Sequence, residues 1–334
     1  AAQARYLQMC IQKRVGRRVL LDADELADLD MVFNVVRSEI GSLVILLTTN
    51  MLRRPWCAGQ IVIAHMSHRN AFAVKTLSFR APTDCAVQDL DSYLDSRGHG
   101  VAELGLAIAD IAAAYRWLLS DDMPQVSLDA GVCGRHRLDQ AVGAFLGASA
   151  TGHAATDLLT EAPGKLMFVS DAGDDEASAA AAVLLRLVSE SMVGAILLAD
   201  YLDCSAEDTF AAVRQALAVV AVLTHGALAS APFAHAVAAA MQVAEAAPDS
   251  FEVIPVHAPG FQIPLAAGLA SGMGRTFPGI DGLWAEKTLQ RFVELDSLVF
   301  SSDASIGVIK AQAARIVARI PKQGTVAREQ FFSA

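Results

Sequence analysis

The stretch from Ser42 to Ala64 limits the possible folds of this chain more than any other. Ser42 to Leu47 is an uncharged apolar run of strand length, rich in branched side chains. A polar turn follows, and Pro55 then precedes apolar residues at helical spacing, in a position suited to the first turn of a helix. A buried strand, a turn and a helix form the repeating unit of parallel sheets.

The same alternation of strand and helix continues along the whole chain and predicts an α/β fold, with parallel sheets covered by helices on both faces. The expected strands are 19–21, 42–47, 71–79, 123–128, 165–170, 195–199, 218–223 and 251–257. The expected helices are 5–13, 31–40 with Asp30 as N-cap, 56–64, 84–94, 101–119, 138–146, 176–189, 206–217, 232–244, 284–293 and 305–319. A strand would normally precede the first of these helices, so the chain is interpreted as a fragment or as lacking its own first strand.

The two halves of the chain share one pattern. A short strand, an acidic loop, a helix and an apolar strand follow one another in 19–48 and again in 196–224, with Arg37 and Arg214 in the middle helices. A repeat of this size indicates duplicated domains. We therefore expect one domain in 1–150, a linker in 151–164 and a second, divergent domain in 165–322.

Composition excludes several classes of function. The 334 residues carry a formal charge of −10, which argues against nucleic acid and a polybasic membrane surface as partners. The segment from Gln215 to Ala244 has no charged residue, but its turn residues predict a strand, a turn and a buried helix in place of a membrane span. Five cysteines without metal-ligand spacing indicate a reduced, cytoplasmic protein without a zinc site.

Four pieces of the first half resemble the TIR (Toll/interleukin-1 receptor) domain family. They are Val19 to Asp22, the acidic loop after it, Leu43 to Thr48, and Arg54-Pro-Trp-Cys57. The resemblance covers residues 4–148 and, more weakly, 165–320. It implies two flavodoxin-like α/β domains of the TIR type. Members of that family either assemble with other TIR domains or cleave the bond between nicotinamide and ribose in NAD.

For the enzymes of the family, the resemblance implies a pocket beside the acidic loop and the helix after the third strand. Asp22, Asp24 and Trp56 would line it and bind NAD as substrate or ligand, with no other cofactor required. The family's catalytic Glu falls at Gln60, whose amide can hydrogen-bond a hydroxyl but cannot supply a negative charge. Losing one preorganised electrostatic group costs about 100- to 1000-fold in rate.

The second repeat departs further from the family pattern. Phe233 replaces the Trp, and the position of the catalytic Glu falls at Ala236 or Val237, both apolar. The resemblance therefore implies that the second domain has no catalysis of this kind.

Several of these residues also have simpler interpretations. Trp56 can pack the helix on the sheet, Cys57 can be a buried structural thiol, and the acidic loop can be a solvated surface. Gln60 can be a relic of the Glu, an introduced substitution or a surface amide. The Asp171, Asp174 and Asp175 cluster suits a phospho-receiver metal site, but the required Lys is missing after the last strand. His65 and His68 have helical spacing for a metal but no third ligand.

Two functional hypotheses follow. The first is a signalling or scaffold module that associates with other TIR-type domains, including further copies of itself. The second is an NAD nucleosidase impaired by Gln60. The substitution Gln60→Glu distinguishes them, because only an enzyme should gain turnover from it.

Overall fold

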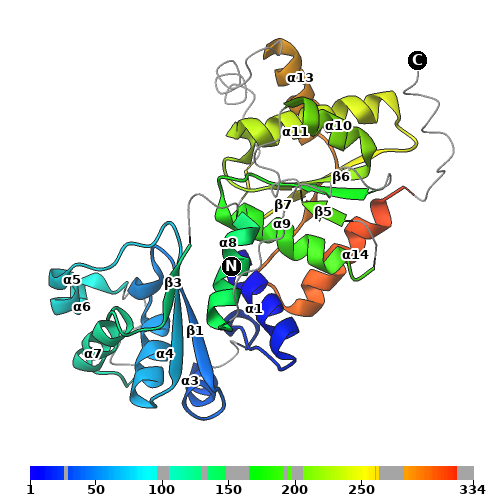
Figure 1. The fold of residues 1–334 in the computed structure, drawn as a ribbon. Coiled ribbons are helices and arrows are strands. Elements are labelled where there is room, and N and C mark those ends of the chain that lie inside the picture. Colours follow the sequence, from blue (N-terminus) through cyan, green and yellow to red (C-terminus); the bar gives the residue numbers. More distant parts are fainter. Residues whose placement is uncertain are drawn as a thin grey trace. The chain divides into compact units, whose positions relative to one another are not determined.

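The computed structural model describes residues 1–25, 29–95, 105–128, 134–147, 165–191, 195–197, 206–259, 261–262 and 282–321 (Figure 1). The chain divides into two compact units. The N-terminal unit comprises residues 10–132 and 137–150, and the C-terminal unit comprises residues 1–9, 133–136 and 151–334. The predicted boundary near residue 150 grouped residues 1–9 with the first domain, whereas their contacts place them in the C-terminal unit.

The N-terminal unit contains a parallel three-stranded sheet in the order β1-β2-β3. Its elements are the C-terminal part of α1 (Ala2–Val15), α2 (Asp22–Glu25), α3 (Leu29–Ser38), β1 (Ser42–Leu47), the 3₁₀ helix η1 (Met51–Arg53), α4 (Pro55–Met66), β2 (Asn70–Lys75), α5 (Asp84–Gln88), α6 (Leu90–Tyr93), α7 (Ile108–Leu118), β3 (Gln125–Ser127) and most of α8 (Gly134–Phe145). β1 and β2 run in register from Ser42 opposite Asn70 to Leu47 opposite Lys75.

Alternate residues of these strands face two different layers of helices. Ile45 and Leu47 are buried in a cluster with side chains of α4 and α7. On the other face, the Phe72 ring meets the Phe145 ring of α8 edge-on, with 5.5 Å between the centroids. The sheet is thus covered on both sides, as parallel strands require.

The C-terminal unit contains a parallel five-stranded sheet in the order β5-β4-β6-β7-β8. Its elements are β4 (Lys165–Val169), α9 (Asp175–Val188), β5 (Ala195–Leu197), α10 (Ala206–Gln215), β6 (Ala216–Leu223), η5 (Ala227–Ala229), α11 (Ala231–Ala246), β7 (Glu252–His257), α13 (Gly282–Val293), β8 (Leu298–Val299) and α14 (Ile306–Arg319). In chain order the strands lie 2-1-3-4-5, which is the flavodoxin-like order. The predicted α/β class with parallel sheets is confirmed.

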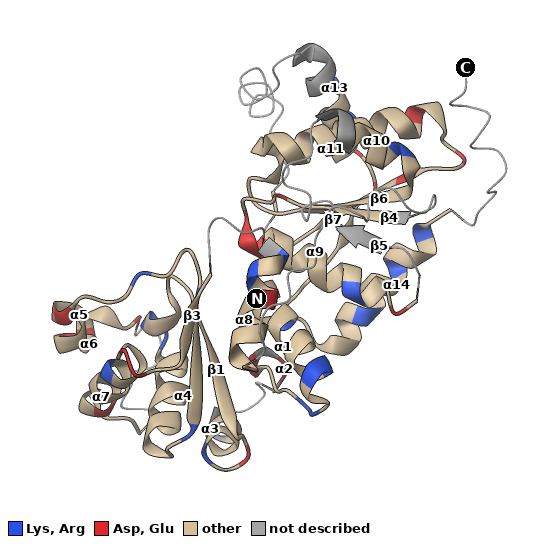
Figure 2. Ribbon diagram, viewed as in Figure 1, with Lys and Arg blue, Asp and Glu red and all other residues tan. Residues whose placement is uncertain are grey.

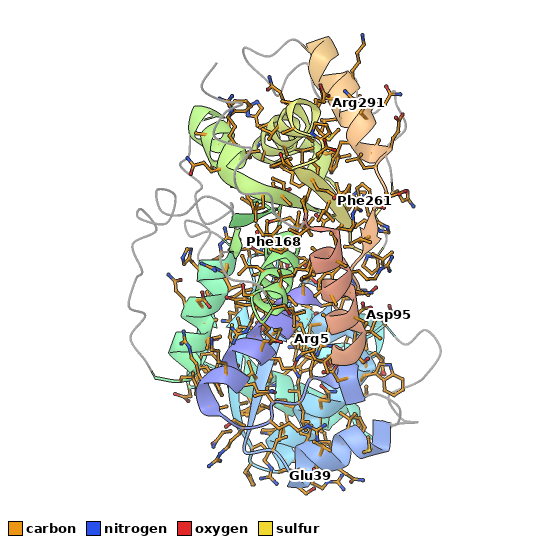
Figure 3. The ribbon with its side chains drawn as sticks, turned by 90° about the vertical axis from the view of Figure 1, so that its right-hand side faces the viewer. Arg5, Glu39, Asp95, Phe168, Phe261 and Arg291 are labelled. Carbon is orange, nitrogen blue, oxygen red and sulfur yellow. The ribbon has the colours of Figure 1, made fainter. Side chains whose placement is uncertain are left out.

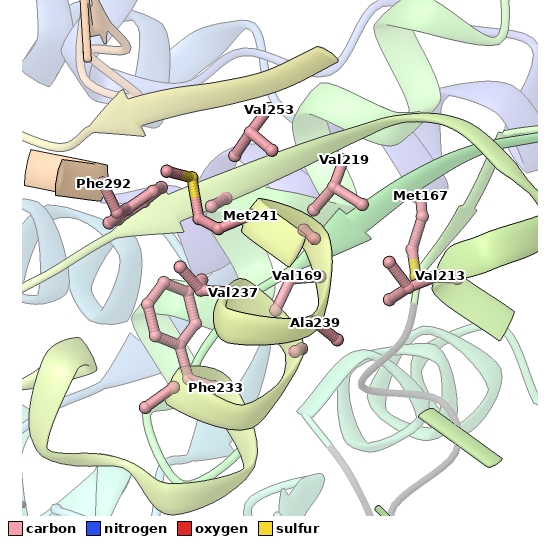
Figure 4. Packing of buried hydrophobic residues seen from close by; sticks show 14 of the residues in the cluster. Met167, Val169, Val213, Val219, Phe233, Val237, Ala239, Met241, Val253 and Phe292 are labelled. Atoms are coloured by element: carbon pink, nitrogen blue, oxygen red, sulfur yellow. The ribbon is translucent and has the colours of Figure 1, made fainter. Parts of the chain in front are cut away.

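The core of this unit lies on both faces of its sheet. One face packs Met167, Val219 and Val253 against α10, α11 and α13, where Phe233 and Phe292 fill the space between helix and sheet (Figure 4). Phe168 points to the opposite face, which the contacting pair α9 and α14 covers (Figure 3). Small residues dominate α9 and α11, so these helices can approach the strands closely.

The same turn occurs after the corresponding strands of the two units. β1 is followed by η1 and α4, and β6 is followed by η5 and α11, each α-helix with a proline in its first turn. Gly226 supplies the positive φ of 89° that begins the second turn. This shared order of elements agrees with the internal repeat seen in the sequence.

The start of α1 is fixed within the C-terminal unit by two polar groups. The Glu176 carboxylate accepts hydrogen bonds from the backbone nitrogens of residues 1 to 3, where a negative charge stabilises a helix N-terminus. The fully buried Arg5 donates to the carbonyl oxygens of Ser302 (3.4 Å) and Ala304 (2.8 Å) (Figure 3). The first contact joins α1 to the first turn of α9, and the second joins it to the loop before α14.

Some predicted elements are wrong. Residues 19–21 form no strand. Among the described residues, no strand pairs with the outer side of β1, so residues 19–21 have no neighbouring strand to pair with. The Val19 N–H donates instead to the Gln12 side chain. The acidic loop begins as the short helix α2, and Asp30 lies inside α3 instead of capping it. The predicted helix 84–94 is split at Asp89 into α5 and α6, and β8 was missed because it has only two residues.

Gly59 allows α3 and α4 to pack closely, which gives a test of the N-terminal unit. A Cβ atom there would lie 2.5 Å from Cζ of Phe33 and 3.2 Å from a methyl of Leu106. Overpacking costs about 1–3 kcal/mol, and the better helix propensity of Ala returns about 1 kcal/mol. We expect Gly59→Ala to lower the free energy of unfolding in urea by about 1 kcal/mol.

Gly41→Ala is the matched control, because a Cβ at Gly41 would meet no atom within 4 Å. Its free energy of unfolding should stay within about 0.5 kcal/mol of the wild type. If Gly59→Ala were as stable as the control or more stable, the close contact between Gly59 and Phe33 would be contradicted.

Candidate functional site

The four residues predicted to form a site lie on two elements of the N-terminal unit. Asp22 and Asp24 are on the short helix α2, and Trp56 and Gln60 are on α4. Trp56 and Gln60 are four residues apart and share one face of the helix, where both are half-buried. Asp22 is exposed and Asp24 is half-buried.

Electrostatics at Cys57 place Asp22 close to the first turn of α4. The pKa of the Cys57 thiol is raised to about 11, first by burial and then by the negative charge of Asp22, whereas the Arg54 guanidinium lowers it. Asp22 therefore acts on the residue next to Trp56. The structure thus brings this part of the acidic segment near the N-terminal turn of α4.

Two tyrosines hold the backbone in front of α4, and the sequence alone did not point to either. The fully buried Tyr115 hydroxyl of α7 donates to the Leu52 carbonyl oxygen at 2.5 Å. Burial raises the pKa of Tyr115, so it remains a donor. The Arg53 guanidinium lies 5.8 Å from the centre of the Tyr93 ring and bonds the Tyr93 carbonyl. These contacts fix η1 and thus the direction in which α4 begins.

The corresponding helix of the C-terminal unit has no comparable surface. Phe233, which replaces the Trp, is 1% exposed, and Ala236 and Val237 are fully buried in the core. Both candidate positions for the family's Glu thus point into packed apolar side chains. A ligand could not reach them without opening that core.

The acidic residues after β4 have structural partners. The Asp174 carboxylate caps α9 by accepting from the Glu176 N–H (2.9 Å), and it also accepts from the Thr224 hydroxyl at the end of β6 (2.9 Å). Asp171 accepts from the Gly173 N–H in the intervening turn. Their arrangement serves to cap a helix and to tie two strand ends together.

His65 lies in the last turn of α4, and His68 lies just after the helix. The His65 ring lies against the Trp117 ring, with 5.1 Å between centroids, and His68 follows the helix end with a positive φ of 50°. Across the described part of the chain, no group of three potential metal-binding side chains occurs. Over the same residues, no helix has the length and apolar character needed to cross a membrane.

Comparison of the chain with protein-family models and with curated proteins gives no match. The resemblance to TIR domains therefore remains a prediction from the sequence. What the structure adds is the parallel α/β architecture and the proximity of Asp22 to the start of α4.

The placement of Asp22 can be tested through the chemistry of Cys57. With a pKa of about 11, only about a thousandth of this thiol is ionised at pH 8, so it should react with iodoacetamide far more slowly than the exposed Cys85. Removing the negative charge in Asp22→Asn should lower the pKa of Cys57 and speed its alkylation, measured by mass spectrometry of the Cys57 peptide as a function of pH.

Asp121→Asn removes an exposed carboxylate in the turn after α7 and serves as the control. It should leave the alkylation rate of Cys57 unchanged. Equal rates in the wild type and in both variants would show that Asp22 does not lie near the start of α4.

Proposed function

We propose that this chain is an association module whose α/β units bind other domains of the TIR type, including further copies of itself. Signalling or scaffolding of this kind requires complementary surfaces and no catalytic group. The formal charge of −10 makes protein a more suitable partner than nucleic acid or an anionic membrane.

One observation carries the proposal: neither unit has a carboxylate at the position that the family's catalysis requires. α4 has the amide of Gln60 there, and α11 has the buried Ala236 and Val237. An amide retains the shape of Glu but provides no charge for an oxocarbenium-like transition state. The side chains of Ala236 and Val237 offer no polar atom.

NAD hydrolysis by the N-terminal unit is the second candidate. The observation in its favour is the negative charge of Asp22 beside the first turn of α4, next to Trp56. If the enzyme interpretation holds, Gln60→Glu should restore a charge and raise the rate of nicotinamide release by about 100- to 1000-fold.

The experiment combines sedimentation velocity with an assay of nicotinamide release. We expect the wild type to associate as its concentration rises and to release no nicotinamide from NAD. Gln60→Glu should associate in the same way and should also release none. Gln88→Glu, which adds the same charge at an exposed position on α5, is the matched control.

A gain of turnover in Gln60→Glu but not in Gln88→Glu would favour the nucleosidase. A wild type that releases nicotinamide and sediments as a monomer at every concentration would contradict the association module.

A further inference from the structure

The end of α1 carries a cluster of positive charges on an acidic protein. Lys13 and Arg14 lie in the last turn of this helix, and Arg17 and Arg18 follow it directly. All four side chains are exposed, and residues 1–21 contain no Asp or Glu. We call these four residues the basic surface. It contrasts with the formal charge of −10 on the whole chain.

The backbone gathers the four basic side chains at one end of the helix. The Gly16 N–H donates to the Gln12 carbonyl (3.0 Å), and the positive φ of 64° at Gly16 ends the helix. The Val19 N–H donates to the Gln12 side chain (3.2 Å), so the chain turns back beside the last turn. The pair of basic residues after the helix is therefore held close to the pair inside it.

Three of these charges are not neutralised within the described part of the chain. Lys13, Arg14 and Arg17 form no ion pair with a described residue. Like charges held together repel one another, and the negative end of the helix dipole offsets only part of that repulsion. An acidic partner would relieve it.

The N-terminal unit carries complementary charges on α5 and α6. Asp84 lies in the first turn of α5, Asp91 lies in the first turn of α6, and Asp89 lies between the two helices. These three exposed residues are called the acidic surface, and residues 84–95 contain no Lys or Arg. Asp89 caps α6, whereas Asp84 and Asp91 have no ion-pair partner among the described residues.

The basic and acidic surfaces lie on opposite sides of the three-stranded sheet. α5 and α6 pack against α7, which covers the sheet face that contains Ile45 and Leu47. The end of α1 lies across the sheet from them (Figure 2). One N-terminal unit therefore cannot bring its own two surfaces into contact, whereas two copies of the chain can.

We propose that the basic surface of one chain binds the acidic surface of a second copy in a head-to-tail contact. The inference rests on the proposed association function and names its surfaces and its partner. Such a contact leaves one surface of each kind free at the two ends, so it allows assemblies of more than two copies.

A second copy suits the basic surface in size and in charge. Nucleic acids present an extended row of phosphates and favour a wide basic face, whereas four residues at one helix end match the small acidic surface on α5 and α6. Complementary charges guide two proteins into one orientation. The exposed Val15 side chain, which lies between the basic pairs, loses water contact when the surfaces meet.

Reversing the charge of each surface tests the contact in the full 334-residue chain. The basic-surface variant combines Arg14→Glu with Arg17→Glu. The acidic-surface variant combines Asp84→Lys with Asp91→Lys. All four side chains are exposed, so the substitutions leave the core intact, and circular dichroism and thermal melting verify that both variants are folded.

The control variant combines Arg116→Glu on α7 with Lys287→Glu on α13. Both side chains are exposed and lie outside the two surfaces. The control has the same net charge as the basic-surface variant, so it separates a general effect of charge from an effect of position.

We expect the wild type and the control to associate alike in sedimentation equilibrium. Each surface variant alone should have a dissociation constant raised by about tenfold or more, because like charges then face each other. An equimolar mixture of the two surface variants should associate like the wild type, because their surfaces are again complementary. Raising sodium chloride from about 50 mM to about 500 mM should weaken wild-type association, since salt screens exposed charges.

Surface variants that associate like the wild type would overturn the contact and leave the association function standing. A mixture of folded variants that stays as dissociated as each variant alone would overturn it equally. A wild type that is monomeric at every concentration would overturn the second copy as partner. If that monomer bound phosphatidylserine vesicles and the basic-surface variant did not, the basic surface would be assigned to an anionic membrane. The nicotinamide assay decides separately between a module and an enzyme, because the substitutions leave Gln60 and Trp56 in place.

Discussion

Parallel pairing of buried strands is the constraint on which this structure depends. Consecutive parallel strands must be joined by a crossover, and the helices of these crossovers cover both faces of the sheet. β1 and β2 in one unit, and β4, β6 and β7 in the other, are apolar enough to require that cover. The alanine-rich helices α9 and α11 provide it at close range.

The turns that precede α4 and α11 are similar, but the helices that follow them have different surroundings. After β1, η1 leads into α4, where Tyr115 and Arg53 fix the turn and where Trp56 and Gln60 stay half-buried on one face. After β6, η5 leads into α11, whose corresponding face is packed into the core around Phe233. The helix face that remains partly exposed in α4 is thus part of the packed core in α11, because its side chains there are apolar. For this reason the proposed function rests on site residues and not on the fold.

The N-terminal unit differs from the C-terminal unit mainly at one sheet edge. β6 has β4 beside it, and β5 can then extend the sheet by pairing with β4. β1 has no such neighbour among the described residues, and residues 19–21, which correspond to β5, form no strand. In the C-terminal unit β4 therefore supports both β5 and β6, whereas among the described residues of the N-terminal unit β1 pairs with β2 alone.

The α/β class, the parallel sheets and most of the helices and strands could be predicted from the sequence alone. The apolar run 42–47 and the proline at the start of α4 are local signals. They can be recognised without knowing which distant residues come into contact. The candidate positions Trp56 and Gln60 could be named for the same reason, although their role rests on a resemblance that no comparison has matched. The tertiary structure decided the rest: that residues 19–21 are not a strand, that Asp22 acts on Cys57, that Tyr115 holds Leu52, and that residues 1–9 belong with the C-terminal unit. Each of these depends on which distant segments come into contact, and strand pairing and long-range hydrogen bonds are not encoded in the local pattern of the chain.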